Sequence, residues 1–132
     1  MKIKSLLTIT ALIEVLTGLA LAVMPSATVS VLLGAPLSEP AGLLLGRIGG
    51  VSLISLALGC WLAKNERTSS IVMVKAMILY NVGAISLLVY AALIEKFSGI
   101  GLWPAILTHI GLLIWSLLSL KSELAEKKPD RS

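Results

Sequence analysis

The hydrophobic positions of this chain fall into four long blocks, separated by short segments that hold proline, glycine and charged residues. Each block has 18 residues or more with only isolated polar groups, and a helix of that length crosses about 30 Å of hydrocarbon. The pattern predicts membrane-spanning helices at about 5–24, 41–63, 71–94 and 103–120. We therefore expect an all-α protein, a four-transmembrane-helix bundle that forms a single membrane domain over residues 1–132 and ends in a polar, frayed tail at 121–132.

The segment between the first two blocks, residues 25–40, is apolar in part but too short to span a bilayer. It begins at Pro25, which ends the preceding helix because proline has no amide proton to donate. Val29 and Leu32 give it an apolar character. We expect a short interfacial segment here, formed as a helix that lies along the membrane surface or against the bundle.

The composition supports a membrane protein. With 57% hydrophobic and 14% charged residues, the chain resembles neither a soluble globular domain nor a disordered one. Its basic start resembles a signal peptide, but Glu14 would be unfavourable in the core of a signal sequence, so we expect a retained first helix. The single cysteine, Cys60, has no second cysteine with which to form an internal disulfide and is expected to be a packing residue.

Lysine and arginine are unevenly distributed over the connecting segments. Lys96 lies alone on one side, and nine basic residues lie at the chain ends and around the loop between the second and third blocks. These nine are Lys2, Lys4, Lys64, Arg67, Lys75, Lys121, Lys127, Lys128 and Arg131. Because positively charged segments stay in the cytoplasm, both termini are expected inside a bacterial inner membrane. The net charge of +4 then reflects orientation and lipid headgroups, and nothing in the pattern predicts a nucleic-acid-binding surface.

Four side chains that are costly in hydrocarbon lie within the blocks, one in each: Glu14, Arg47, Asn81 and His109. A rise of about 1.5 Å per residue places Glu14 and Asn81 near the membrane midplane. Arg47 and His109 then lie about 9 Å from the outer ends of their helices. Arg47 is predicted to reach roughly 6 Å along the helix axis and form an ion pair with Glu14, because an unpaired charge at this depth costs several kcal/mol.

Tyr80 lies beside Asn81 and adds a hydroxyl to this group. Together the five residues predict a ligand-binding polar pocket inside the bundle, with Glu14, Arg47, Tyr80, Asn81 and His109 as its candidate residues. The alternative is that the same groups only hold the helices together.

Small residues recur along the second block. Gly42, Gly46 and Gly50 are spaced by four residues, which allows another helix to approach closely. The approaching helix is either the first block of the same chain or part of a second copy. The spacing is compatible with both.

His109 is the one histidine of the chain, which also lacks a cysteine pair and a Glu-x-x-His motif. We therefore expect no metal site within a single chain. The sequence assigns no catalytic residue and no cofactor.

A series of short motifs runs between Leu12 and His109. They are Glu14 to Leu21 (EVLTGLAL), Leu33-Gly34, Gly46-Arg47, Gly59-Cys60-Trp61, Tyr80-Asn81, and Leu102-Trp103-Pro104 followed by His109. Together they resemble a group of uncharacterised small bacterial four-helix integral membrane proteins, loosely similar to the DoxX-like class. The resemblance implies a four-helix bundle and an accessory role beside quinone-linked or thiol redox systems. It brings no catalytic residue to this sequence.

The leading functional hypothesis is a multi-pass, non-enzymatic accessory protein, or a subunit that binds a small, quinone-like ligand in the polar pocket. A first alternative is a proton-coupled small-molecule transporter that uses Glu14, since the surroundings of this residue are similar to those of the glutamate of small multidrug resistance transporters. A second is a membrane-embedded enzyme with His109 as its base. The lipid bilayer, a second copy of the chain and a membrane redox protein are the partners considered, and the sequence does not identify the ligand or the oligomeric state.

Overall fold

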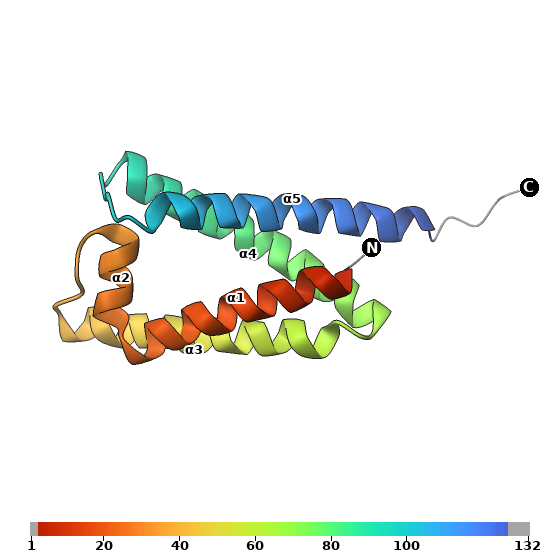
Figure 1. Cartoon of the computed structure of the whole chain (residues 1–132), viewed down its shortest axis with the longest axis horizontal. Coiled ribbons are helices and arrows are strands. Elements are labelled where there is room, and N and C mark those ends of the chain that lie inside the picture. The colour runs from red at the N-terminus through yellow and green to blue at the C-terminus, as the bar shows by residue number, and fades with distance from the viewer. Residues whose placement is uncertain (1–2, 127–132) are drawn as a thin grey trace, which may run out of the picture.

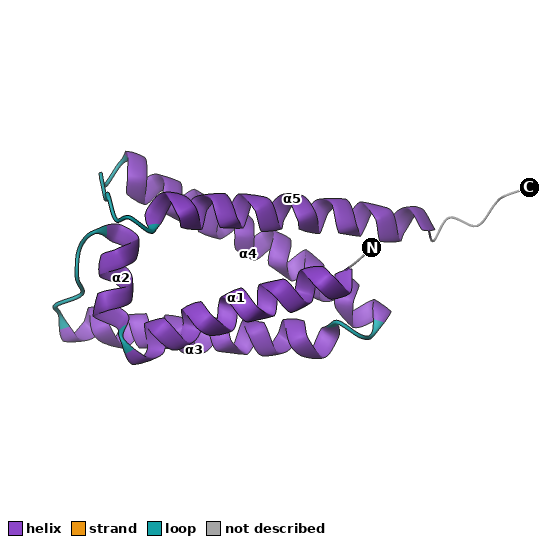
Figure 2. Cartoon of the chain, in the orientation of Figure 1, coloured by secondary structure: helices purple, strands orange, loops and turns teal. Residues whose placement is uncertain are grey.

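The computed structural model describes residues 3–126. This part of the chain is helical, with short connections (Figure 2). Its elements are α1 (Ile3–Val23), α2 (Pro25–Leu33), α3 (Pro40–Ala63), α4 (Arg67–Leu93) and α5 (Leu102–Glu126). All except α2 are long and apolar enough to cross a membrane. The predictions of an all-helical chain and of four helices capable of spanning a bilayer are therefore confirmed.

The long helices associate as two pairs. α1 packs along α3, and α4 packs along α5 (Figure 1). The short helix α2 stands across one end of the molecule and contacts α1, α3 and α5. The start of α1, the α3–α4 loop and the end of α5 meet at the opposite end, where Lys4, Lys64 and Glu123 line one depression.

Proline and glycine set the bounds of α2 and α3. Pro25 and Pro40 begin these two helices, at positions where the missing amide proton would have no partner. α2 ends at Gly34, whose φ of 82° is the left-handed conformation that glycine adopts without strain. The N–H of Gly101 donates to the carbonyl of Val31 at 2.9 Å, so the α4–α5 loop is anchored to α2. The short helix predicted after Pro25 is thus present.

α4 begins at Arg67, four residues before the predicted start at 71. Glu66 caps the helix, because its carboxylate accepts hydrogen bonds from the backbone N–H groups of Thr68 and Ser69. Hydrogen bonds from Ser69 and Thr68 lower the pKa of Glu66 to about 2. The first turn of α4 is polar, so a boundary drawn from hydropathy came too late.

α5 extends to Glu126, so residues 121–126 of the predicted tail are helical. Arg67 Nε lies 3.2 Å from Glu123 Oε2 and its Nη2 donates to the Glu123 carbonyl at 3.1 Å. These contacts tie the end of α5 to the start of α4. The prediction of a frayed tail is wrong for this segment, and residues 127–132 lie outside the described residues.

The hydrophobic core occupies the half of the molecule opposite α2. Its buried members are Ile3, Leu6, Leu7, Ala11, Ala57, Cys60, Ala63, Val74, Met77 and Leu112. Cys60 is fully buried there, as expected of a packing residue. In the α2 half the two helix pairs diverge (Figure 1), so this half has no comparable core among the described residues.

Glycine allows the closest contact between the long helices. A Cβ atom on Gly50 would lie 2.6 Å from the carbonyl oxygen of Gly18 and 2.9 Å from the Cα of Ala22. A Cβ on Gly18 would lie 2.7 Å from the carbonyl of Gly50. Gly50 therefore packs against α1 of the same chain, whereas Gly46 faces Pro25 and Leu37, and Gly42 faces Leu37. For Gly50 this decides between the two neighbours that the sequence allowed.

Replacing Gly50 with alanine should destabilise the fold by about 1–3 kcal/mol, because the added methyl group meets backbone atoms that cannot move aside. The free energy of unfolding in detergent micelles, followed by circular dichroism, measures the effect. Gly111→Ala is the matched control, since a Cβ at Gly111 meets no atom within 4 Å. Equal stabilities of the two variants would contradict the close approach.

Candidate functional site

A cavity of about 700 Å³ lies in the α2 half of the molecule, between the two helix pairs. Most of the residues that line it are apolar, including Leu21, Leu53 and Leu88. Its polar lining residues are Glu14, Thr17, Thr28, Tyr80, Thr108 and His109, which come from α1, α2, α4 and α5. Four separate elements therefore contribute polar groups to a largely apolar chamber.

Glu14 lies at the boundary between the core and this cavity. The side chain is only 2% exposed. Its Oε2 accepts a hydrogen bond from the Tyr80 hydroxyl at 3.3 Å, whereas its Oε1 accepts none from the described residues. A buried carboxylate with one unsatisfied oxygen is energetically costly, which marks this position as one that packing alone does not explain.

Asn81 and His109 form a second polar contact, between α4 and α5. The Asn81 amide nitrogen donates to the Met77 carbonyl at 2.7 Å, which leaves the amide oxygen as the acceptor that faces the ring. His109 Nδ1 lies 2.8 Å from this oxygen. Nδ1 must therefore carry the proton, and in the neutral ring Nε2 keeps a free lone pair.

Tyr80 joins these two contacts. Its ring meets the His109 ring edge to face, with the centroids 5.6 Å apart and the planes at 71°. The structure therefore brings together four of the five predicted site residues, Glu14, Tyr80, Asn81 and His109. Asn81 is fully buried behind His109, does not line the cavity and positions the ring from behind.

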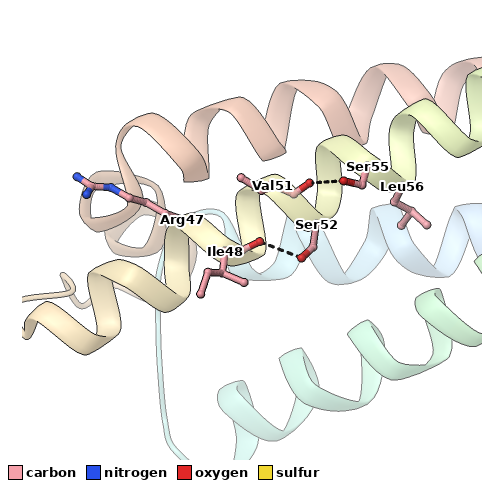
Figure 3. Close-up of a pocket in the computed structure, with 6 residues that line it drawn as sticks. All are labelled: Arg47, Ile48, Val51, Ser52, Ser55 and Leu56. Carbon is pink, nitrogen blue, oxygen red and sulfur yellow. Dashed lines mark hydrogen bonds between the residues drawn. The ribbon is translucent and has the colours of Figure 1, made fainter.

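Arg47 is the exception. It lines a separate depression on the surface of α3, beside Ile48, Val51, Ser52, Ser55 and Leu56 (Figure 3). The side chain is exposed and extends toward the beginning of α3. Among residues 3–126 the one salt bridge is that between Arg67 and Glu123, so the predicted ion pair between Arg47 and Glu14 is wrong.

The register of α1 against α3 explains the separation. Gly49 of α3 faces Leu21 of α1, and Leu21 is seven residues, about 10 Å, along the helix from Glu14. Arg47 lies still farther from Glu14 than Gly49 does, because the two helices are antiparallel. A long basic side chain near a helix end lowers its cost by extending to the interface, and Arg47 points in that direction.

Two of the threonines that line the cavity, and the contribution of α2, were not predicted from the sequence. Thr28 lines the cavity from α2, and Thr108 lines it from α5, one residue before His109. Gly83 of α4 also lines it, and a Cβ there would meet no atom within 4 Å. Residue type alone could not single out these positions, because threonine and glycine are common in membrane helices.

Metal binding has no support in the described residues, where no three histidine, cysteine, aspartate or glutamate side chains gather as metal ligands. Comparisons with models of protein families, with curated proteins and with solved structures found no match to this chain.

The Asn81–His109 contact predicts the tautomer of the ring. Because the chain has one histidine, ¹⁵N NMR of protein labelled at histidine should show a single ring with the proton on Nδ1. Asn81→Leu should abolish this preference and cost about 1–3 kcal/mol of stability, since the ring loses a buried partner. Ser86→Ala, at an exposed position on the same helix, is the control. A ring protonated on Nε2 in the wild type would contradict the assignment.

Proposed function

We propose that this protein is a multi-pass, non-enzymatic membrane protein that binds a small amphipathic molecule in the cavity between its helix pairs. The observation that carries the proposal is the buried Glu14 carboxylate at the wall of a largely apolar chamber, with one oxygen that accepts no hydrogen bond from the described residues. A ligand with an apolar body and a polar head would match both the chamber and this group.

The cavity is suited to a ligand that arrives from the bilayer. Several lining residues are exposed, namely Thr17, Leu79, Gly83, Leu87 and Thr108. The chamber therefore opens to the surface between α1 and the α4–α5 pair. In a membrane this surface borders lipid, so a lipophilic molecule could enter without crossing water.

Charge supports an orientation in which the α2 end faces outward. Lys4, Lys64 and Arg67 lie together at the end opposite α2, and by the positive-inside rule that end is cytoplasmic. Both chain ends would then be inside a bacterial inner membrane, and α2 would lie at the outer interface above the cavity. Lys2, Lys127, Lys128 and Arg131 also contribute to the charge bias but lie outside the described residues.

The resemblance to the DoxX-like class bears on the role. It would place the protein beside a membrane redox system, either as an accessory subunit or as a carrier of a quinone-like ligand. A bundle of four spanning helices in contact with a partner protein, or with a second copy of the chain, is part of the same proposal. Arg47 could take part in such a contact, since it lies exposed on α3.

Filling the cavity tests the proposal. Gly83→Leu would place an isobutyl group in the chamber without a clash at its Cβ. Wild-type protein purified from its membrane in mild detergent should retain a small molecule that mass spectrometry detects, and the variant should lose most of it. The matched control is Gly111→Leu, which adds the same group at an exposed site outside the cavity. Equal retention by wild type and Gly83→Leu, or retention by neither, would overturn the proposal.

A proton-coupled transporter is a second candidate, favoured by the separation of Glu14 from Arg47. An arginine beside the carboxylate would neutralise it, and the described residues provide no such partner. Proteoliposomes with wild-type protein should then accumulate tetraphenylphosphonium when a proton gradient is applied, and Glu14→Gln should abolish the uptake. Glu95→Gln removes an exposed carboxylate elsewhere and should leave uptake unchanged. Uptake that survives Glu14→Gln excludes this candidate.

A further inference from the structure

The polar side chains around the cavity differ in what they offer a ligand. Thr28 donates its hydroxyl proton at 2.8 Å to the carbonyl of Met24, the residue just before α2. Thr108 does the same to the Pro104 carbonyl, also at 2.8 Å. A hydroxyl group has one proton and two lone pairs, so both threonines have only acceptor capacity left.

Tyr80 and Glu14 also have only hydrogen-bond acceptor sites left for a ligand. The Tyr80 hydroxyl proton points to Glu14 Oε2, so the phenol oxygen retains lone pairs for a ligand. Glu14 Oε1, in a side chain that is 2% exposed, accepts nothing from the described residues. As a carboxylate it has only acceptor sites.

His109 completes the pattern. Its Nδ1 proton goes to Asn81, whose own amide proton goes to the Met77 carbonyl. The other ring nitrogen, Nε2, is then an acceptor in the neutral ring. Thr17 is the one polar lining side chain of the described chain whose proton is not committed within the protein.

No lysine or arginine is found among the described residues that line the cavity. Apart from the Thr17 hydroxyl, the lining thus combines one carboxylate with a set of lone pairs, and its described residues include no cation. A ligand whose head only accepts hydrogen bonds, such as a quinone, would find one donor, Thr17, and would leave the other lone pairs unsatisfied. A head that donates protons and is positively charged would satisfy the lone pairs and balance the carboxylate.

We propose that the cavity selects a lipophilic amine in its protonated form, held by Glu14, Thr108 and His109 as acceptors. This inference depends on the proposed function, because it specifies the ligand of the same cavity. The ammonium head brings three N–H donors and one positive charge. The apolar body would lie along the leucine-rich walls.

Three probes separate the contribution of donors from that of charge. 4-Phenylbutylamine carries both, its N,N,N-trimethyl derivative keeps the charge without donors, and a phenylbutyl-substituted benzoquinone offers acceptors only. Isothermal titration of each probe into full-length protein in nanodiscs, with empty nanodiscs subtracted, gives the Kd values. The amine should bind at least about tenfold more tightly than either other probe, since each unsatisfied buried pair costs roughly that factor.

Two variants connect this preference to the site. Glu14→Gln keeps an oxygen for Tyr80 but loses the charge, and it should weaken amine binding at least about tenfold. Glu95→Gln makes the same chemical change at an exposed residue outside the cavity and should have no effect. Thr108→Val removes one acceptor at an exposed position and should weaken amine binding several-fold, which provides a second test if Glu14→Gln does not fold.

The outcomes distinguish this inference from the proposed function. Quinone binding that equals or exceeds amine binding, and that Gly83→Leu blocks, would overturn the inference and leave the proposed function standing. Equal binding of the amine and its trimethyl derivative would show that donors are not selected, and would also overturn the inference. Absence of binding by all three probes, together with equal retention of small molecules by wild type and Gly83→Leu, would remove both.

Discussion

The burial of the Glu14 carboxylate is the constraint on which the arrangement of this molecule depends. α1 packs mainly along α3, yet its one acidic side chain takes its hydrogen bond from Tyr80 of α4. The contact therefore joins one helix pair to the other. On one side of it the pairs close around the hydrophobic core, and on the other side they diverge around the cavity. Glu14 lies at the boundary between the hydrophobic core and the cavity.

The short helix α2 makes the divergent half possible. It stands between the pairs, and the α4–α5 loop is bonded to it through Gly101 and Val31. Its inner face supplies Thr28, Val29 and Leu32 to the cavity wall. A segment too short to cross a bilayer therefore closes one end of the cavity between the long helices, and its apolar residues Val29 and Leu32 form part of the cavity wall.

The position of Arg47 changes the chemistry expected of the site. A guanidinium beside Glu14 would have formed an ion pair inside the protein in which each charge is balanced by the other. Such a pair would only hold the helices together. With Arg47 on the outer surface of α3, the carboxylate has only the weaker partner Tyr80 among residues 3–126. Apart from the Thr17 hydroxyl, the lining of the cavity then has negative and acceptor character, and its described residues include no lysine or arginine.

The residue pattern alone predicts the four long helices, the short helix after Pro25 and four of the residues that meet at the site. These features can be predicted because the length of each apolar block, its hydropathy, the positions of proline and the cost of polar groups in lipid all depend on the local sequence. It misplaced the start of α4 and the end of α5, where the polar cap at Glu66 and the contact between Arg67 and Glu123 extend helices beyond their apolar blocks.

Which polar groups face one another depends instead on how the helices pack. The four long helices are apolar on nearly all sides, so hydropathy does not identify their inward faces. The close approach of Gly18 and Gly50 sets the register of α1 and α3, and that register moves Arg47 away from Glu14. The rotation of each helix about its axis and its position along that axis depend on contacts with neighbouring helices. A hydropathy pattern along the sequence does not show these contacts.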